Sequence, residues 1–365
     1  MKKIVISTGG GDAPGLNAVI YAVVKAAHSR DWEVYGSRSG YKGLLDTDEL
    51  IRLTPDIVAD ITPTGGTILG STNKGNPFAM PVENLAGDIQ IRDVSDRVMK
   101  NFTRMGFFCH IAIGGDGSLE IAHRFATEKG MPVIGVPKTI DNDLKATLLT
   151  FGFDTAVSTA TEALDKLHST AKSHDRVMVV EVMGRDSGWI ALNSGISGGA
   201  DIILIPEIPF DVNIICQKIS ENELYGKHYA IVVVAEGASA INTERICKDK
   251  SEIGRQDVLL GGIGEWVAKQ IKECAGKDTR SLVLGHLQRG GSPTTFDRLL
   301  ALRFGAAAVR MAENKSFDKM IALDGSEMKA VNLADAIKGR KKVPLDSDKI
   351  LTARDIGICF GDAVE

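Results

Sequence analysis

The chain has 365 residues, of which 44% are hydrophobic and 25% are charged, and its formal net charge is −4. This composition is typical of a globular protein and not of a disordered or membrane protein, and the length suggests two domains. The slight negative charge provides no broad basic surface for a nucleic acid, so a few placed cations must hold any phosphate. We therefore expect small phosphorylated ligands, with no nucleic acid and no membrane among the partners.

The N-terminus and the cysteines indicate a cytoplasmic location. Only Ile4, Val5 and Ile6 precede the first polar residues, too few for the core of a signal peptide, and no later apolar run reaches the length of a membrane span. The cysteines show no CxxC pair and no histidine at metal-ligand spacing. They are Cys109, Cys216, Cys247, Cys274 and Cys359. We expect all of them to be reduced thiols.

Short apolar runs alternate along the chain with segments of helical spacing. The runs lie at 3–8, 109–115, 132–137, 176–182, 201–207, 228–236 and 280–286, and helical spacing is clear at 17–29 and 117–130. Continuous apolar strands, each followed by a helix, are typical of parallel sheets covered on both faces. The sequence predicts an α/β fold of two Rossmann-like three-layer domains with mainly parallel sheets. The site is expected in the cleft between them, at the carboxyl ends of strands.

The first predicted strand runs into a glycine-rich loop, STGGGDAPGLN at 7–17. Glycines allow backbone N–H groups to approach phosphate oxygens, and the N-terminus of the following helix favours an anion. The loop lacks the Gly-Lys-Ser/Thr of a Walker motif and the GxGxxG spacing of a dinucleotide fold. A tight strand-to-helix turn without a ligand is the alternative, and this loop alone is a weak indication of a phosphate site.

The second loop is GGDGS at 114–118, again between a predicted strand and a helix. Its glycines clear space for phosphates, and Asp116 suits a Mg²⁺ ion that bridges phosphate oxygens. The sequence GGDG also occurs in NAD kinases and lipid kinases, so it indicates a nucleotide-phosphate site without naming the acceptor. The alternative is an Asp that caps the helix after a glycine turn.

The third loop, PKTIDND at 137–143, carries two carboxylates two residues apart, Asp141 and Asp143. One can accept a hydroxyl proton while the other faces the metal or orients its neighbour, and an ordinary carboxylate suffices where the transition state is loose. Taken alone, this motif indicates a solvated acidic turn. Because it follows one strand after GGDGS, however, both loops should lie at the same edge of a parallel sheet.

A set of cations lies near the predicted strands: Arg176, Arg185, Arg280, His286 and Arg289. Single arginines are usually surface charges, and a lone histidine is usually a core residue. These five gather at strand ends, and converging guanidinium groups are suited to bidentate recognition of a sugar phosphate.

These four motifs, in this order and at these intervals, resemble those of the phosphofructokinase family over nearly the whole chain. The segment RSLVLGHLQRGGSPTTFDR at 280–298 is similar to the signature of that family. The resemblance implies an ATP-dependent 6-phosphofructokinase of glycolysis, which uses Mg²⁺ and transfers the γ-phosphoryl group of ATP to the 1-hydroxyl of fructose 6-phosphate.

The resemblance assigns the donor side of the site residue by residue. It places Gly10 and its loop on the donor phosphates, Asp116 on Mg²⁺ and Tyr41 beside the donor. The residues that would line the nucleotide are Gly115, Gly117 and Ser118.

On the acceptor side, the resemblance makes Asp141 the general base that takes the proton from the 1-hydroxyl. Arg185 would neutralise charge on the transferring phosphoryl group, and Thr139 and Asp143 would hold the acceptor and support the base. The residues that would grip the 6-phosphate are Arg280, His286 and Arg289, and those that would meet the sugar are Met183, Gly184 and Glu236.

Two further properties are implied by the resemblance. Arg176 and Arg280 reach across a subunit boundary in this family, which implies a homo-oligomer, a tetramer or a dimer, with shared active sites. The domains would comprise 1–152 plus 293–342 for the donor and 153–288 plus 343–365 for fructose 6-phosphate.

The choice of phosphoryl donor depends on two positions. Family members that use pyrophosphate usually have a second Asp after the metal-binding Asp, which repels the α-phosphate of ATP, whereas here Gly117 leaves room. Lys138 stands where the pyrophosphate enzymes also have Lys, and it can hold the terminal phosphate of a short donor without excluding ATP. We expect ATP and keep pyrophosphate as the alternative donor.

The chain departs from the family pattern in two places. Tyr21 and Lys25 stand where regulated bacterial enzymes have arginines, so the usual control by ADP and phosphoenolpyruvate is not expected. The segment 70–78, GSTNKGNPF, lacks the arginine that many relatives place near the transferred phosphate. Lys74 is the nearest cation there, although it lacks the fork of a guanidinium group.

Two other classes of function stay open. A dinucleotide-dependent oxidoreductase could use Arg38 to hold a 2′-phosphate, but the first loop has the wrong glycine spacing. A catalytically silent sugar-phosphate sensor should have lost its base or its metal ligand, and both Asp141 and Asp116 are present.

Overall fold

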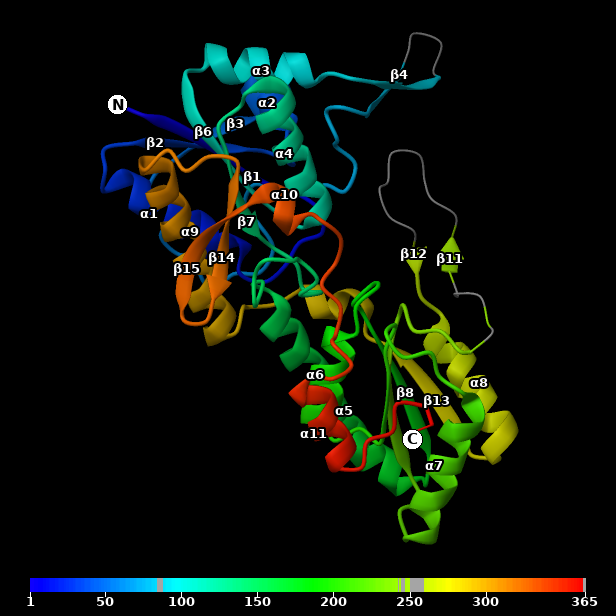
Figure 1. Ribbon diagram of the computed structural model, residues 1–365. Helices are drawn as coiled ribbons and strands as arrows, with labels where there is room; N and C mark the ends of the chain where they lie inside the picture. Colours follow the sequence, from blue (N-terminus) through cyan, green and yellow to red (C-terminus); the bar gives the residue numbers. More distant parts are fainter. Residues whose placement is uncertain (84–87, 242, 244–246, 250–258, 364–365) are drawn as a thin grey trace.

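The computed structural model describes residues 1–83, 88–241, 243, 247–249 and 259–363. Figure 1 shows two lobes, with the N-terminus in one and the C-terminus in the other. In the described residues, the first lobe is built on a seven-stranded sheet and the second on a four-stranded sheet. Helices cover both faces of each sheet, so each lobe has three layers.

The sheet of the first lobe is mainly parallel, with an antiparallel strand at each edge. In order across the sheet, its strands are β15 (Glu327–Asn332), β14 (Lys319–Asp324), β7 (Val133–Pro137), β6 (Phe107–Gly114), β1 (Lys3–Thr8), β2 (Glu33–Ser37) and β3 (Leu50–Leu53). The edge strands β15 and β3 are the antiparallel ones.

Side chains alternate between the two faces of this sheet, as the period of two in a strand requires. Ile4 and Ile6 of β1 belong to one core, which α1 (Leu16–His28) and α9 (Thr295–Glu313) cover, whereas Val5 belongs to the other. The second core lies under α2 (Lys42–Leu45), α3 (Ser95–Arg104), α4 (Asp116–Lys129) and α10 (Leu333–Ala336).

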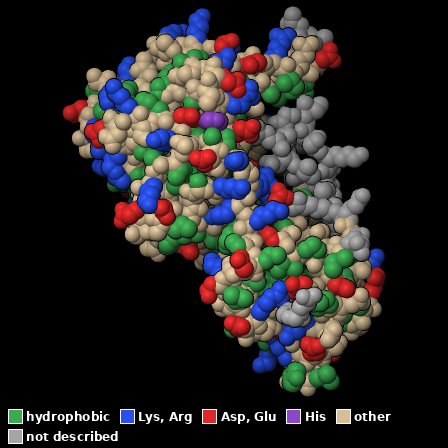
Figure 2. Space-filling model, in the orientation of Figure 1, with side chains coloured by type: hydrophobic (Ala, Val, Ile, Leu, Met, Phe, Trp, Pro, Cys, Tyr) green, Lys and Arg blue, Asp and Glu red, His purple; other side chains and the backbone are tan. Residues whose placement is uncertain are grey.

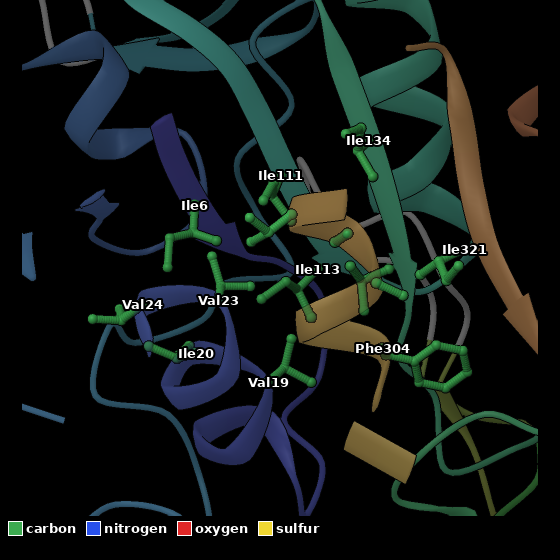
Figure 3. Packing of buried hydrophobic residues seen from close by; sticks show 14 of the residues in the cluster. Ile6, Val19, Ile20, Val23, Val24, Ile111, Ile113, Ile134, Phe304 and Ile321 are labelled. Atoms are coloured by element: carbon green, nitrogen blue, oxygen red, sulfur yellow. The ribbon is translucent and has the colours of Figure 1, made fainter. Parts of the chain in front are cut away.

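The helices α1 and α9 pack side by side over the first core. Figure 3 shows Val19 of α1 and Phe304 of α9 in the same cluster as the strand residue Ile113. At Gly305, an added Cβ would lie 2.6 Å from the carbonyl oxygen of Val19 and 2.8 Å from the Cβ of Ala22. The two helices therefore approach too closely for a larger side chain at this position.

The second lobe contains a fully parallel sheet. In order, its strands are β13 (Thr279–Val283), β8 (Val177–Val182), β10 (Ala230–Ala235) and β9 (Ile202–Leu204). One face is covered by α5 (Phe153–Ser173), α6 (Trp189–Ser197) and α11 (Asp348–Asp355), and the other by α7 (Val212–Leu224) and α8 (Ile263–Ala275).

The remaining elements are short. They are the hairpins β4 (Met80–Glu83) to β5 (Ile89–Arg92) and β11 (Cys247–Asp249) to β12 (Leu259–Leu260), and the 3₁₀ turns η1 (Thr47–Glu49) and η2 (Gly285–Arg289). Among the described helices, none has both the length and the apolar character that crossing a membrane demands.

The chain passes between the lobes more than once. It leaves the first sheet after β7 and enters the second lobe at α5, and it returns after β13 to form α9, β14 and β15. Between α10 and α11 it crosses again, through residues 337–343, which we call the strap (Figure 1). Each crossing runs past the place where the two lobes meet.

The predicted fold class is confirmed. All seven apolar runs singled out in the sequence form strands, and both lobes are α/β layers around a parallel or mainly parallel sheet. Four strands of the first sheet, β2, β3, β14 and β15, were not singled out. At the edges, β3 and β15 carry exposed side chains that break the continuous apolar pattern of a buried strand.

The expectation of five reduced cysteines is wrong for one pair. Cys216 of α7 and Cys274 of α8 form a disulfide, with their Cα atoms 6.4 Å apart. The two helices cover the same face of the second sheet, which brings together residues separated by 58 positions. Cys109 and Cys359 are free thiols, and the side chain of Cys247 lies outside the described residues.

The close approach of α1 and α9 can be tested with Gly305→Val. Glycine normally disfavours a helix by about 1 kcal/mol relative to alanine, but here the added atoms would push the two helices apart, so we expect a loss of about 2–3 kcal/mol in the free energy of unfolding. Urea unfolding followed by circular dichroism measures it. Ala306→Val, a partly exposed neighbour, is the size-matched control. Equal urea midpoints for the two variants would refute this account of the contact.

Candidate functional site

A cavity of about 420 Å³ lies where the lobes meet. The first lobe lines it with the loops that follow β1, β6 and β7, and the second lobe contributes Arg185 and Arg289. The strap adds Arg340. The cavity therefore lies outside the carboxyl ends of parallel strands, as expected for an open α/β sheet.

The glycines of the first loop leave space that any side chain would fill. An added Cβ would lie 2.5 Å from Ser118 Oγ at Gly9, 3.2 Å from Lys138 Nζ at Gly10 and 2.8 Å from Arg289 Nη1 at Gly11. Gly10 also has a φ of 77°, which a residue with a side chain rarely adopts. The loop is therefore a bare surface beside a hydroxyl, an ammonium and a guanidinium group, and these groups fit a chain of phosphates.

Two backbone amides of this loop have partners within the protein. The N–H of Gly9 donates to Ile113 O at 2.9 Å, and the N–H of Gly10 donates to Thr72 O at 3.1 Å. These two amides pair with neighbouring segments and do not point at a ligand. The favourable groups around the loop are instead the side chains named above.

Asp116 is the first residue of α4, directly after Gly115. Its Oδ1 accepts a hydrogen bond from the N–H of Gly117 at 2.9 Å, and its Oδ2 lies 3.3 Å from Nη2 of Arg340. The described residues hold no cluster of three or more His, Cys, Asp or Glu that would bind a metal by themselves. A single carboxylate still fits Mg²⁺, because this ion usually takes one or two carboxylates and completes its shell with phosphate oxygens and water.

Asp141 is only 4% exposed, yet it lines the cavity. Its N–H donates to Thr139 Oγ1 at 3.0 Å, which fixes the loop, and its Oδ2 lies 3.9 Å from Nε of Arg185. Oδ1 has no hydrogen-bond partner in the part of the chain that the structure describes. A buried, unpaired acceptor is unfavourable for folding, so its position at the cavity suits a group that receives a proton from a ligand.

Asp143 lies on the same loop and is also buried. Burial raises its pKa to about 7, and the carboxylates of Asp141 and Asp116 add to the rise, while Arg340 and Arg185 oppose it. The intervening Asn142 has a φ of 51°, which asparagine tolerates better than most residues. Three carboxylates thus share the cavity, and the cations around them limit the repulsion.

Arg185 follows β8 in an uncommon backbone conformation. Its φ is 50°, in the left-handed region, and its N–H donates to Glu236 Oε1 at 3.1 Å. Burial, followed by the nearby charge of Asp141, raises the pKa of Glu236. Left-handed backbone at a residue other than glycine is unfavourable and often marks a functional site. Here it turns the Arg185 side chain toward Asp141.

The five predicted cations do not all meet. Arg289 lines the cavity and donates to Asp12 O at 3.1 Å. Arg176 and Arg280 instead lie at the amino ends of β8 and β13, where both pair with Asp278 at 2.5 and 2.8 Å. A strand of six residues is about 20 Å long, so its two ends cannot serve one small cavity. The expected convergence is therefore wrong for Arg176 and Arg280 within one chain.

Of the other predicted residues, some line the cavity and some do not. Tyr41 lines the cavity, stacks on Phe125 with ring centroids 5.1 Å apart, and has its pKa raised by burial. Lys74 is exposed and lies outside the cavity, although its neighbours Thr72 and Asn73 line it. Met183, Gly184, Glu236 and His286 are not among the residues that line the cavity, although Glu236 accepts a hydrogen bond from the N–H of the lining residue Arg185.

Arg340 and Asp186 are among the residues near this site that sequence reasoning missed. Arg340 and Asp186 form an ion pair at the cavity, and Arg340 also contacts Asp116 and Asp143. Asp186 directly follows Arg185 in the sequence, and this adjacency is a signal that could have placed it near the cavity. Arg340 lies in a basic run, KGRKK at 338–342, which has no motif that distinguishes it from a solvated surface.

The burial of Lys138 leads to a prediction about pH. Burial, followed by Arg289 and Arg185, lowers its pKa to about 8. At pH 7 this lysine is charged in both the folded and the unfolded state, and burying the charged ammonium group destabilises the folded state in full. Above pH 10.5 the lysine is neutral in both states, and this destabilisation disappears.

We therefore expect Lys138→Met to raise the free energy of unfolding at pH 7, by about 3 kcal/mol for a pKa lowered from 10.5 to about 8. The gain should shrink as the pH rises to 10. Urea unfolding at both pH values measures it, with the exposed Lys342→Met as the control. A gain that does not change with pH would contradict the assignment.

Comparison with known proteins gives the same picture over the whole chain. The phosphofructokinase family model matches residues 3–312. An ATP-dependent 6-phosphofructokinase of Chloroflexus aggregans is 49% identical over 361 residues, which cover 99% of this chain and 98% of that protein. A pyrophosphate–fructose 6-phosphate 1-phosphotransferase of Streptomyces coelicolor is 47% identical over 360 residues, covering 98% of this chain and 100% of that protein.

The fold has a counterpart among solved structures. A phosphofructokinase structure from Saccharomyces cerevisiae matches 93% of this chain with a TM-score of 0.78 and 28% identity. This chain spans 45% of the yeast chain, less than half its length. The family match over residues 3–312 and the relatives of equal length lead to one conclusion: the chain belongs to the phosphofructokinase family.

Proposed function

We propose that this protein is an ATP-dependent 6-phosphofructokinase of glycolysis, which makes fructose 1,6-bisphosphate from fructose 6-phosphate. The observation that carries the proposal is a single cavity lined by Asp116, Asp141 and Arg185. Phosphoryl transfer needs a ligand for the metal of the donor, an acceptor for the hydroxyl proton and a cation beside the transferring group. The names of full-length relatives such as the Chloroflexus enzyme agree with this activity.

On the donor side, the phosphates of ATP would lie along the bare loop at Gly10, beside Ser118 Oγ and Lys138 Nζ. Asp116 would hold Mg²⁺, which when bound would offset the charge of the donor phosphates. Tyr41 would lie beside the donor, and Gly117 would leave room for its α-phosphate.

On the acceptor side, the oxygen of the 1-hydroxyl would attack the γ-phosphorus while the bond from this phosphorus to the leaving oxygen of ADP breaks. The hydroxyl proton would pass to Asp141, whose Oδ1 has no partner among the described residues. Arg185 would offset the charge that develops on the transferring group. Thr139 and Asp143 would hold the acceptor and support the base.

The position of Arg176 and Arg280 supports a shared site. Arg289 and His286, near the cavity, would bind the 6-phosphate together with Arg176 and Arg280 from a neighbouring copy of the chain. Such a site requires a homo-oligomer, a dimer or a tetramer. We also propose the domain division 1–152 plus 293–342 and 153–288 plus 343–365, and a cytoplasmic location stays a prediction.

Pyrophosphate is the second candidate donor, and Lys138 is the reason. Its ammonium group lies beside the bare loop at Gly10, where it can hold the terminal phosphate of a short donor. The Streptomyces relative, at 47% identity, carries pyrophosphate in its name. The oxidoreductase and sensor readings have less support, because Arg38 is exposed and does not line the cavity, whereas Asp116 and Asp141 both do.

The role of Asp141 can be tested with Asp141→Ser. Loss of the proton acceptor should lower turnover about 10²- to 10⁴-fold, while fructose 6-phosphate still binds because its other contacts stay. A coupled assay gives the turnover and calorimetry gives the binding. Asp165→Ser, on the exposed face of α5, is the matched control. If Asp141→Ser turned over as fast as this control, Asp141 would not be the base.

The choice of donor can be tested by offering ATP and pyrophosphate separately. We expect a higher kcat/KM with ATP in the wild-type protein. Gly117→Asp should weaken the use of ATP more than the use of pyrophosphate, because a carboxylate there repels the α-phosphate. Equal or better turnover of the wild type with pyrophosphate would overturn the donor assignment, and an unchanged preference in the variant would mean that Gly117 does not set it.

A further inference from the structure

The strap places one guanidinium group among three carboxylates at the edge of the cavity. Arg340 Nη2 lies 3.3 Å from Asp116 Oδ2, and its Nε lies 3.7 Å from Asp143 Oδ2. Its Nη1 forms an ion pair with Asp186. These partners come from the loop after β6, the loop after β7 and the loop after β8, so Arg340 joins the two lobes at the site.

The backbone on either side of this side chain is fixed. Arg340 forms an antiparallel bridge with Leu144, and the N–H of Lys341 donates to Asp143 O at 2.7 Å. The oxygen of Lys341 accepts from Trp189 Nε1 at 3.0 Å. The strap is therefore tied to the third loop on one side and to the second lobe on the other.

The ammonium group of Lys341 strengthens this attachment. It donates to Asn142 Oδ1 at 3.0 Å and to the carbonyl oxygens of Thr147 and Leu148 at 3.0 and 2.9 Å. All three N–H groups of this ammonium therefore donate to the loop that carries Asp143. The position of Arg340 is thus set by the same loop that holds the proposed base.

Among the described lining residues, the loops of the first lobe that follow β1, β6 and β7 contribute no arginine to the cavity. The segment 70–78 contains no arginine, and Lys74 lies outside the cavity. Figure 2 shows Lys and Arg side chains gathered where the two lobes meet. Among the described residues that line the cavity, the arginines are Arg185, Arg289 and Arg340. Arg340 is the one in contact with Asp116, next to the proposed place of the donor phosphates.

A carboxylate oxygen that pairs with Arg340 cannot at the same time be a free ligand of a divalent cation. Asp116 Oδ2 is the oxygen that Arg340 approaches, and Asp116 is the residue proposed for Mg²⁺. The guanidinium group is always charged, so it and a divalent cation compete for Asp116. When the metal takes Asp116, Nη2 of Arg340 is released from that carboxylate and can donate to a phosphate oxygen, while Nε and Nη1 keep Asp143 and Asp186 as partners.

We propose that Arg340 is a further catalytic residue of this site. In the donor-free protein, Arg340 offsets the charge of Asp116 and Asp186 and competes with the metal for Asp116. With the donor bound, Arg340 contacts the transferred phosphate. It thereby takes the role of the arginine that segment 70–78 lacks. This inference rests on the proposed function, since it needs a phosphorylated donor in the cavity.

The test compares Arg340→Gln and Arg340→Lys with the control Lys342→Gln, which removes an exposed cation from the same strap. Binding of Mn²⁺ to the donor-free proteins is measured by electron paramagnetic resonance. We expect Mn²⁺ to bind Arg340→Gln about tenfold more tightly than the control, because removing a nearby positive charge favours a cation. Arg340→Lys keeps the charge and should stay close to the control.

The kinetic arm of the test uses ATP and fructose 6-phosphate. For Arg340→Gln we expect kcat to fall about 10²-fold or more, with a nearly unchanged KM for fructose 6-phosphate. Arg340→Lys should restore only a small part of kcat, since an ammonium group lacks the fork. Circular dichroism establishes that each variant is folded, and Arg340→Lys serves if Arg340→Gln does not fold.

Either of two results would overturn the inference. One is a Mn²⁺ affinity of Arg340→Gln that matches the control, and the other is a kcat that matches it. Failure of the proposed function gives a different result: the wild type and the Lys342→Gln control would then transfer no phosphoryl group from ATP, while the Mn²⁺ measurement would still decide whether Arg340 competes for Asp116.

Discussion

The parallel pairing of β1, β6 and β7 is the constraint on which the whole site depends. Thr8 lies opposite Ile113, and Gly114 lies opposite Pro137, so the three strands end at nearly the same level. Their loops therefore begin side by side and have to share one edge of the sheet. A bare glycine loop, a helix N-terminus with a carboxylate and a second acidic loop meet there without any long-range adjustment of the chain.

Bringing the charged side chains of the site together destabilises the folded protein while no ligand is bound. Burial and neighbouring carboxylates raise the pKa of Asp143, and burial with neighbouring arginines lowers the pKa of Lys138. Both shifts mean that the charged forms are less favourable here than in water. The strap reduces the repulsion by bringing Arg340 among the carboxylates. A phosphorylated donor with its metal would offset the charges on both sides, so the site is better suited to the loaded state than to the empty one.

The sequence was sufficient for the three strands that carry the site, β1, β6 and β7, although β2 and β14 of the same sheet were not singled out. The strands, the three loops that follow them and the edge they share all follow from local apolar runs and from parallel pairing. Contacts between segments that are distant in the sequence could not be predicted. Arg340 meets Asp116 across 224 positions, and the Cys216–Cys274 disulfide joins helices that only the second sheet brings together. Arg176 and Arg185 were placed together although the predicted strand between them already separates its two ends by about 20 Å.

The order of the segments bears on how the chain folds as it is synthesised. The helix α9, which covers half of one core of the first lobe, and the strands β14 and β15, which extend its sheet, come from residues 295–332. The whole second sheet precedes them in the chain. The first lobe consequently stays open on one side, with the apolar face of α1 exposed, until most of the polypeptide has left the ribosome. A nascent chain of this kind has the exposed surface that chaperones bind.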